Sequence, residues 1–485
     1  MIPEDTMHRR TFLTSTAALT MAGLTVPAAA VQSRPPTTTG PRATRATTLD
    51  QLRQEIAAAG PGARIVLANG TYDVPADRPL AFQGKHGTAS APITVLAETR
   101  NQVILTGQRG FTFADSSDVT INGFVFRQRS TLDLPTSCSG IRLTRNDFQF
   151  TDSSGLNWVL VRADNTKLDR NHFHGKSTLG VFLGIEGPGS AGMARGVLVQ
   201  RNYFSDHTFT GDNGGEPIRL GLSGRSLSDA GALIELNLFE RANGDPEAIS
   251  VKSGSNTIRD NTIRNSLGGI VLRHGNKSRV EGNFILAGSN GIRIYGNDHL
   301  IVNNYVENVS GSGIVLGSGS VRDHLASDSP ESRRGNDAPD RVTIALNTVL
   351  SSGTAIAGES VRTLPPLGCT ISDNLLVGDS GKTLVSMPYQ QGIAWSGNIL
   401  WGQASNGNIS GGFSRKDPLL TTGGVRRLTS GSPAINAASK TYPTVTRDVD
   451  GNSRSGRADV GADEYSTAAP TNRPLTTTDV GPSAP

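Results

Sequence analysis

Long apolar runs are scarce in this sequence. Outside the first 30 residues, no stretch approaches the roughly 18 apolar residues that a membrane-spanning helix requires, so we expect no membrane span after the signal described below. The net charge is only +4, and no basic run carries interleaved aromatic residues. Nucleic acid is therefore not an expected partner, although the small positive excess suits an acidic one. Nothing in the sequence indicates an oligomeric state.

The first 30 residues have the layout of an export signal. Arg9 and Arg10 precede an apolar run that ends near Val26, and residues 28–30 are alanines. A basic start, a short apolar centre and small residues at the end are typical of a cleaved signal, and the paired arginines resemble the twin-arginine type. The alternative is a membrane anchor that stays uncleaved. We expect a bacterial protein that is exported to the periplasm or the medium.

Three further segments are set apart by composition. Residues 31–47 are rich in Pro, Thr and Arg and are predicted to form a linker, and residues 466–485 form a Thr/Pro tail that we expect to be disordered. Residues 48–59 are predicted to form a short helix, because apolar residues recur in it at helical spacing and Thr48 with Gln51 fits a capping box.

A motif of an apolar strand, an asparagine and one or two large apolar residues recurs along the chain. The spacing is near 22–25 residues with longer insertions, which is typical of a solenoid. The units are short and rich in Val, Ile and Thr, so we predict an all-β fold, a single-stranded right-handed parallel β-helix over residues 48–465 with the helix as its N-terminal cap. The asparagines are expected to form a structural ladder at one bend. They are Asn122, Asn146, Asn171, Asn202, Asn237, Asn261, Asn283, Asn304, Asn347, Asn374 and Asn398.

The predicted solenoid determines whether the two cysteines can form a disulfide. Cys138 and Cys369 lie about eight repeats apart, roughly 40 Å along the axis, whereas a disulfide spans less than about 7 Å between Cα atoms. We therefore predict free thiols. The longest gap between asparagines contains a polar stretch, residues 323–340, which we expect to leave the stack as a loop.

Charged residues fall into register when consecutive turns are aligned. With Ile249, Ile270 and Ile292 pointing inward, one outward column is predicted to contain Lys252, Arg273 and Tyr295, and the adjacent one Ser250, Val271 and Arg293. Two stacked cations repel unless an anion lies between them. The alternative without a function is a pair of solvated surface cations that point away from each other.

Acidic and amide groups are predicted at the bend that precedes Lys252. Asp245 and Glu247 lie there, and Asn213 falls near the register of Asp245 one turn earlier. Carboxylate and amide oxygens are hard ligands suited to Ca²⁺, with substrate and water completing the shell. The alternative is an acidic turn that merely pairs with Lys252.

Together these segments resemble polysaccharide lyase family 6, which includes alginate lyases and chondroitinase B. The resemblance covers roughly residues 48–465 and rests on motifs that are each weak but specific as a set. They are NGGE…IRLG (213–221), NLFE (237–240), DxExISxKS (245–253), LRHGN (272–276), GIRIxG (291–296) and DVGADE (459–464).

The resemblance implies a Ca²⁺-assisted β-elimination on an anionic uronic-acid polysaccharide. It implies that Asn213, Asp245 and Glu247 hold Ca²⁺, which neutralises the uronate carboxylate. Lys252, in its uncharged form, would remove the C5 proton, and Arg273 would stabilise the departing sugar. The family usually has Glu at the position of Asp245, and the shorter side chain is expected to weaken Ca²⁺ binding slightly.

Further residues are expected to bind substrate. His174 and Lys176 match a family pattern in FHGKS, with ordinary surface polarity as the alternative. The remaining candidates flank the site or precede the loop of residues 323–340; they are Arg219, His274, Arg293, Tyr295 and Arg322.

Alginate is the expected substrate, and a dermatan or chondroitin sulfate lyase is the alternative within the class. A hydrolase on the same fold would need an acid–base pair of carboxylates, and the Lys/Arg column argues against it. A non-catalytic β-helix that binds carbohydrate is the third possibility. Preference for mannuronate or guluronate, and endo or exo action, depend on loop shapes that the sequence does not specify.

Overall fold

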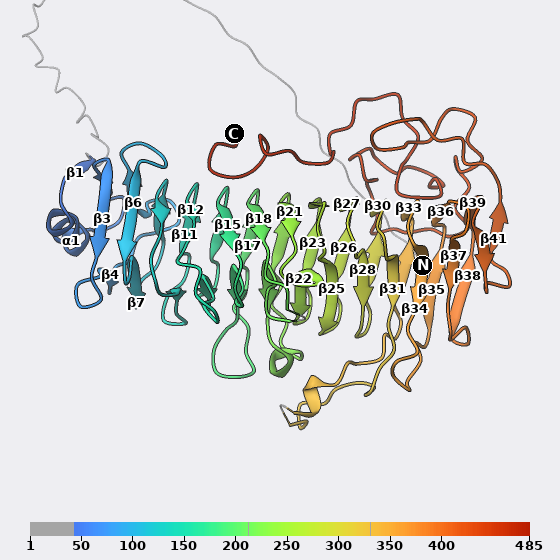
Figure 1. Cartoon of the computed structure of the whole chain (residues 1–485), viewed down its shortest axis with the longest axis horizontal. Coiled ribbons are helices and arrows are strands. Elements are labelled where there is room, and N and C mark those ends of the chain that lie inside the picture. The colour runs from blue at the N-terminus through green and yellow to red at the C-terminus, as the bar shows by residue number, and fades with distance from the viewer. Residues whose placement is uncertain (1–42, 212, 330) are drawn as a thin grey trace, which may run out of the picture. The chain divides into compact units, whose positions relative to one another are not determined.

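The computed structural model describes residues 43–485 except 212 and 330, and the predicted signal of residues 1–30 lies outside this range. All the strand pairs in its sheets are parallel and follow one another at intervals of one turn, which confirms the predicted right-handed parallel β-helix (Figure 1). Most turns contribute one strand to each of three long sheets of 14, 11 and 14 strands, and β4 and β7 form a separate two-stranded sheet. Within the described residues, no helix has the length and apolar character needed to span a membrane.

The first sheet contains β1 (Thr44–Ala46), β2 (Arg64–Leu67), β5 (Ile93–Ala97), β8 (Val119–Asn122), β11 (Arg142–Thr144), β14 (Lys167–Asp169), β17 (Leu198–Gln200), β20 (Leu233–Glu235), β23 (Thr257–Arg259), β26 (Arg279–Glu281), β29 (Leu300–Val302), β32 (Thr343–Ala345), β35 (Cys369–Ser372) and β38 (Ile393–Ser396). The second sheet contains β10 (Leu132–Leu134), β13 (Val159–Val161), β16 (Leu183–Ile185), β19 (Ile218–Leu220), β22 (Glu247–Lys252), β25 (Gly269–His274), β28 (Ile292–Ile294), β31 (Ser312–Leu316), β34 (Thr354–Gly358), β37 (Thr383–Ser386) and β40 (Ser405–Gly407).

The third sheet contains β3 (Gly70–Val74), β6 (Val103–Gly107), β9 (Val125–Phe126), β12 (Asp147–Phe148), β15 (His172–Lys176), β18 (Tyr203–His207), β21 (Leu238–Ala242), β24 (Thr262–Arg264), β27 (Phe284–Leu286), β30 (Tyr305–Glu307), β33 (Thr348–Leu350), β36 (Leu375–Gly378), β39 (Asn398–Gly402) and β41 (Phe413–Arg415). The short elements are β4 (Leu80–Gln83), β7 (Phe111–Ala114) and the 3₁₀ helices η1 (Ser223–Arg225) and η2 (Ser332–Arg334).

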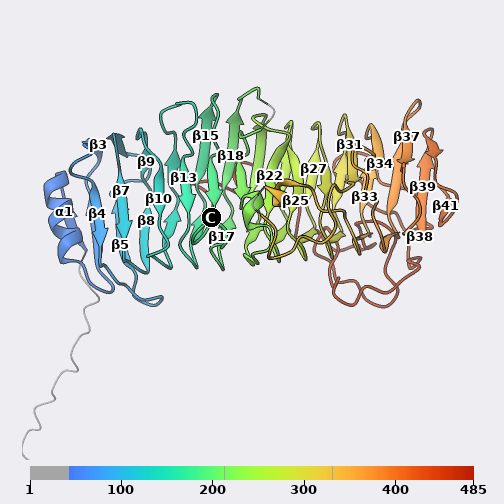
Figure 2. The same cartoon turned by 90° about the horizontal axis from the view of Figure 1, so that it is seen from below.

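The helix α1 (Leu49–Ala58) lies at the N-terminal end of the solenoid, as predicted (Figure 2). Thr48 caps it by accepting a hydrogen bond from the Gln51 N–H, and Leu52 and Ile56 are buried against the first turn. The predicted linker of residues 31–47 ends earlier than expected, because Thr44–Ala46 is a strand that pairs with β2.

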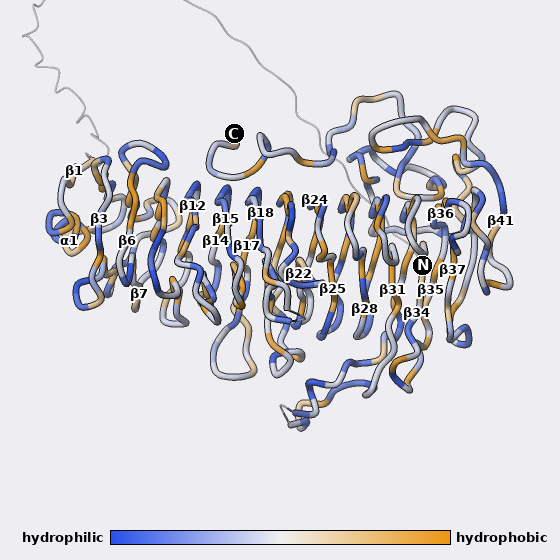
Figure 3. The backbone as a smooth tube through the Cα atoms, in the orientation of Figure 1, coloured by the Kyte–Doolittle hydropathy of each residue, from blue (hydrophilic) through white to orange (hydrophobic). Residues whose placement is uncertain are grey.

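The interior is a stack of similar layers, one for each turn. The few aromatic residues are concentrated there: Phe148, Phe173, Phe204 and Phe239 stack on successive turns, with ring centroids 4.5–4.9 Å apart. This spacing matches the separation of neighbouring strands, so each ring covers the next. Figure 3 shows the apolar residues gathered on the strands and the loop of residues 323–340 as largely hydrophilic.

The predicted asparagine ladder runs through the bend between the first and third sheets. From Asn146 to Asn398, each asparagine donates its side-chain N–H to the Oδ1 of the next at 2.9–3.2 Å. Asn122 is not a member, because Phe124 occupies the ladder position of that turn and donates its N–H to Asn146. The positive φ of the bend falls on the preceding residue, such as Arg145, and not on the asparagine.

The C-terminal segments fold back along the flank of the solenoid (Figure 1). Residues 431–464 pack against side chains of the first and third sheets. Residues 466–485, predicted to be disordered, instead continue in this direction, and Leu475 and Val480 pack on Leu238. Cys138 and Cys369 are both buried and free, as predicted.

Candidate active site

The outer column of the second sheet has the predicted register over four turns. Arg219 pairs with Ser250, Ser250 with Val271 and Val271 with Arg293 across β19, β22, β25 and β28. The inward residues Ile249 and Ile270 are aligned as expected and fully buried.

The predicted column of Lys252, Arg273 and Tyr295 is wrong in one respect. The register between β22 and β25 shifts after Val251, so Lys252 pairs with His274 and Arg273 becomes the extra residue of a β-bulge. A bulge redirects a side chain and increases the local twist. The two cations therefore remain on neighbouring strands but have different partners. Tyr295 is buried, and its hydroxyl donates a 2.7 Å hydrogen bond to Glu359.

Glu247 forms ion pairs with two arginines, Arg273 and Arg293. Its Oε1 accepts hydrogen bonds from Arg273 Nη1 at 3.0 Å and Arg293 Nη2 at 2.9 Å, and its Oε2 accepts one from the Ser250 hydroxyl at 2.5 Å. The carboxylate is buried, while Arg273 and Arg293 keep about a third of their side chains exposed. A buried acid therefore holds two cationic side chains beside open solvent.

Lys252 is paired with a residue that the sequence analysis missed. Its Nζ lies 3.1 Å from Oε1 of Glu216, whose side chain is 1% exposed, and the other oxygen, Oε2, is buried without a hydrogen-bond partner. Glu216 follows Asn213 by three residues in the NGGE motif. Its position directly before a strand of the second sheet was the available signal.

Asp245 completes the group of acids at this bend. It accepts hydrogen bonds from the N–H groups of Gly214 and Glu247, both at 2.9 Å. Burial, reinforced by the negative charges of Glu216 and Glu247, raises the pKa of Asp245 to about 7. Burial is the larger cause, and the two neighbouring carboxylates add to it, so three acidic side chains are gathered at this bend.

The oxygen groups at the bend fit a hard cation. The unpartnered oxygen of Glu216 and its carboxylate neighbours Asp245 and Glu247 would be stabilised by a bound cation, and Ca²⁺ binds such oxygens. The predicted set of Asn213, Asp245 and Glu247 is only partly assembled: Gly214, the neighbour of Asn213, contacts Asp245, but both oxygens of Glu247 are engaged by Arg and Ser.

His274 lies directly beside the two cations. It is 2% exposed, and its Nε2 lies 3.0 Å from the Ser223 hydroxyl. Burial, with added repulsion from Arg273 and Lys252, lowers its pKa to about 3, so the ring is neutral at physiological pH. It can form hydrogen bonds but adds no third positive charge.

Comparison with known proteins assigns the chain to a family. The family model described as Chondroitinase B matches residues 46–419, well over half of the sequence. The chain belongs to the chondroitinase B family. No curated protein matches it significantly.

Solved structures similar to this member of the chondroitinase B family include three polysaccharide lyases. The PL6 family alginate lyase AlyGC has 26% identity and a TM-score of 0.72, covering 91% of this chain and 58% of that one. Pedsa3628 from Pseudopedobacter saltans, a PL6 family polysaccharide lyase, has 25% identity and a TM-score of 0.63, covering 91% and 99%. A mannuronic acid-specific family 6 lyase from human gut microbiota has 23% identity and a TM-score of 0.67, covering 78% and 92%. The chain thus spans 58% of the length of AlyGC.

Two of the predicted substrate contacts of this chondroitinase B family member lie on another sheet. His174 belongs to β15 of the third sheet, where its Nε2 lies 3.0 Å from Asp147. Lys176 is fully buried: its Nζ approaches Thr178 at 3.2 Å and faces the Trp158 ring, so its ammonium is not presented to a ligand. The FHGKS pattern did not reveal that these side chains belong to a different sheet from Lys252 and Arg273.

Two further predicted contacts, Arg219 and Arg322, are tied to loops. Arg219 is in the outer column, and its guanidinium lies 3.6 Å from Glu186. Arg322 pairs with Asp340 and donates to the Pro365 carbonyl at 2.6 Å, so it holds the base of the loop of residues 323–340. This loop leaves the stack as predicted, and Arg333 within it donates a 3.1 Å hydrogen bond to the Gly224 carbonyl of η1. The loop therefore reaches back along the second sheet towards the site (Figures 1 and 2).

Proposed function

We propose that this protein is a polysaccharide lyase that cleaves a uronic-acid polymer, with alginate as the expected substrate, by β-elimination that leaves a 4,5-unsaturated uronate end. The observation that carries the proposal is the placement of Lys252 and Arg273 on neighbouring strands, each held by a buried carboxylate. Family membership and the lyases among the similar structures support it.

The reaction needs a base and a means to stabilise negative charge. The C5 proton of a uronate is weakly acidic, because its removal puts a second negative charge beside a carboxylate. Lys252 is placed to accept this proton once its ammonium has lost its own proton, and Glu216 fixes the position of the amine. Arg273 stays charged and is a poor proton donor, so its role is to stabilise the oxygen of the departing sugar.

The acidic bend is the proposed calcium site. Asn213, Asp245 and Glu247 would hold the ion, with Glu216 next to them. Bound Ca²⁺ would supply positive charge that neutralises the uronate carboxylate and the enolate formed from it. Arg273 and Arg293 share one oxygen of Glu247, so these residues of the chain already concentrate positive charge where the substrate carboxylate would lie.

A neighbouring pocket offers space for a sugar. It lies on the outer face of the second sheet and is lined by Pro246, Val271, Arg293 and Glu359 among others. Export, proposed from the character of residues 1–30, would bring the enzyme to a polymer outside the cytoplasm.

Dermatan or chondroitin sulfate is the second candidate substrate, because the matching family model is that of chondroitinase B. A hydrolase is disfavoured by the charge network: Glu216 and Glu247 are engaged by Lys252 and Arg273 and do not form a free acid–base pair.

Digestion of defined polymers tests the proposal. Poly-mannuronate, poly-guluronate, mixed alginate and dermatan sulfate are each incubated with the enzyme, while ultraviolet absorbance reports unsaturated ends and chromatography reports product size. We expect absorbance to rise with alginate blocks. Cleavage without absorbance would identify a hydrolase, and no cleavage of any polymer would leave a binding protein as the better reading.

A further inference from the structure

A cluster of two histidines and an aspartate lies on the third sheet, away from the strands that carry Lys252 and Arg273. Asp147 in β12 is the direct cross-strand partner of His172 in β15, and His174 follows two residues later on the same strand. Residues two apart on a strand share a face. Phe148 and Phe173 point into the core, so the three polar side chains lie on the outer surface.

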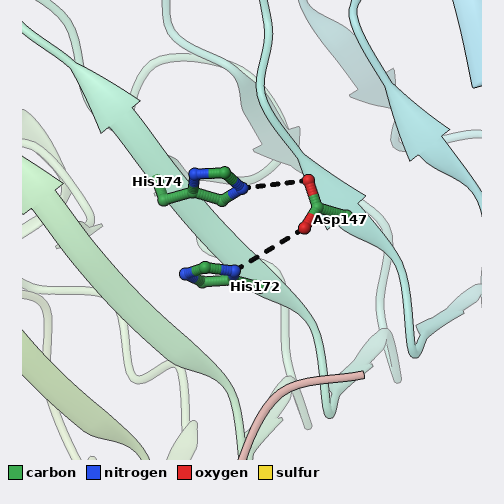
Figure 4. A group of neighbouring side chains, drawn as sticks. All are labelled: Asp147, His172 and His174. Carbon is green, nitrogen blue, oxygen red and sulfur yellow. Dashed lines mark hydrogen bonds and ion pairs between the residues drawn. The ribbon is translucent and has the colours of Figure 1, made fainter. Parts of the chain in front are cut away.

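The ligand atoms of the three side chains converge (Figure 4). His174 Nε2 lies 3.0 Å from Asp147 Oδ1, and His172 Nδ1 lies 3.6 Å from Asp147 Oδ2. Ligands about 2.0–2.1 Å from a tetrahedral zinc ion are separated by roughly 3.3 Å. The observed separations lie on either side of this value. In the described part of the chain, this is the one group of three His, Cys, Asp or Glu residues whose ligand atoms all lie within 4.8 Å of one another.

The cluster is held in place by its surroundings. The rings of His172 and His174 stack with centroids 4.0 Å apart, and Tyr203 on the next turn stacks on His172 at 4.5 Å. The Ser205 hydroxyl lies 3.0 Å from His172 Nε2. A hydroxyl can donate or accept, so this contact persists in the tautomer that binds a metal through the lone pair of Nδ1 and carries the N–H on Nε2. Side-chain exposures of 19–23% leave the group open to an ion and to water.

We propose that Asp147, His172 and His174 bind a divalent transition-metal ion of the zinc class, with water completing the coordination shell. Two imidazoles and one carboxylate select such ions, whereas the all-oxygen bend at Asp245 suits Ca²⁺. The ion would join β12 to β15, on a different sheet from the proposed lyase residues. It therefore links two consecutive turns and takes no part in the elimination.

Metal titration of the full chain tests this site. The metal-stripped protein is titrated calorimetrically with Zn²⁺ in the presence of excess Ca²⁺, and Co²⁺ is used as a visible-absorption probe of imidazole ligation. We expect one Zn²⁺ per chain, a rise in melting temperature, and loss of both in His172→Ala and Asp147→Asn. Ser205→Ala, which removes only the outer contact, is expected to weaken binding by about 10- to 100-fold.

The control is His86→Ala, because His86 is an exposed histidine of another turn that contacts Ser117. Circular dichroism checks that each variant is folded, and Asp147→Asn serves if His172→Ala is not. The proposal is overturned if the wild type binds no Zn²⁺, if Ca²⁺ displaces it, or if folded variants of the cluster bind it as the wild type does. It is also overturned if His86→Ala alone removes the binding.

Discussion

Lys252 and Glu216 form an ion pair across neighbouring turns of the second sheet, with Nζ 3.1 Å from Oε1. Glu216 is almost wholly buried, and Lys252 exposes 13% of its side chain. A buried carboxylate left alone is costly, so each member of the pair requires the other in the absence of substrate and metal. The pair fixes the amine in space but also occupies Nζ with a hydrogen bond to Glu216. Catalysis therefore requires the pair to loosen.

Lys252→Ala is expected to reduce the lyase rate strongly. A positioned base contributes roughly 10²- to 10⁴-fold, and the variant should lose kcat by an amount in this range while still binding the polymer. The rise in ultraviolet absorbance on alginate measures it. Lys382→Ala, at an exposed lysine elsewhere, is the matched control and should keep full activity. A Lys252→Ala enzyme with the wild-type rate would refute Lys252 as the base.

Glu216→Gln tests the partner of that lysine. The variant keeps the shape of the side chain but removes its charge, so Lys252 loses its anchor and the acidic bend loses one carboxylate. We expect kcat to fall by about tenfold or more. Glu98→Gln is the control, because Glu98 forms a largely exposed ion pair with Arg45, and such pairs contribute little. Equal rates for both variants would mean that Glu216 is only structural.

The positions of Glu216 and Arg273 show where sequence reasoning reached its limit. The repeat period predicted which strands are neighbours, because a parallel β-helix turns a spacing of one repeat into a lateral contact. It could not predict the bulge after Val251, since the spacing of paired residues changes only from 21 (Val251 and Leu272) to 22 (Lys252 and His274), which lies within the variation of the repeat length. Glu216 was missed because burial of an acid depends on the loops that cover it, and these lie outside the repeat.

The asparagine ladder and the C-terminal tail show the same contrast between features that the sequence predicts and features that it does not. The ladder was predictable because one residue type returns at one bend, and ten of the eleven asparagines occupy it, from Asn146 to Asn398. The tail of residues 466–485 has the composition of a disordered segment, yet Leu475 and Val480 bind it to the solenoid. Composition averages over a segment and does not register two apolar contacts.

Chelation is expected to lower both activity and stability. A ligand that binds only the folded state stabilises it by about 2.7 kcal/mol at a concentration 100 times its Kd. EDTA should therefore abolish cleavage and lower the melting temperature, and added Ca²⁺ should restore cleavage and the part of the melting temperature that depends on Ca²⁺. Asp245→Asn should reduce the Ca²⁺-dependent shift, whereas Asp50→Asn at an exposed aspartate of α1 should not. Full activity of the wild type in EDTA would remove calcium from the proposed mechanism.

His299 is expected to make the fold sensitive to acid. It accepts a hydrogen bond from the Ser278 N–H at Nδ1 and donates one from Nε2 to the Tyr295 carbonyl, both at 3.0 Å. Burial lowers its pKa from 6.5 to about 4. As the pH falls below 6.5, the unfolded chain takes up a proton that the native state still excludes, so stability is lost progressively down to about pH 4.

The expected loss from this group is up to about 3 kcal/mol. Urea unfolding at several pH values measures it, as the difference between the wild type and His299→Gln. That difference should shrink as the pH falls from 6.5 to 4. His86→Gln, at an exposed histidine, should parallel the wild type throughout. If His299→Gln also parallels the wild type, His299 does not control the acid response.

The packing of the C-terminal tail predicts its resistance to protease. Leu475 and Val480 are buried against Leu238, and the exposed Arg473, two residues before Leu475, is paired with Asp479 at 2.7 Å. Truncating a buried leucine to alanine costs about 2–5 kcal/mol. We expect this loss to exceed the free energy that holds the short tail against the solenoid. The double variant Leu475→Ala/Val480→Ala should therefore release the tail, and endoproteinase Asp-N should cut before Asp479 much faster than in the wild type. Mass spectrometry of the released peptide measures this cut separately from cleavage at other aspartates. Thr477→Ala, at an exposed position of the same segment, should leave the rate unchanged, and rapid cutting of the wild type before Asp479 would show that the tail is not held.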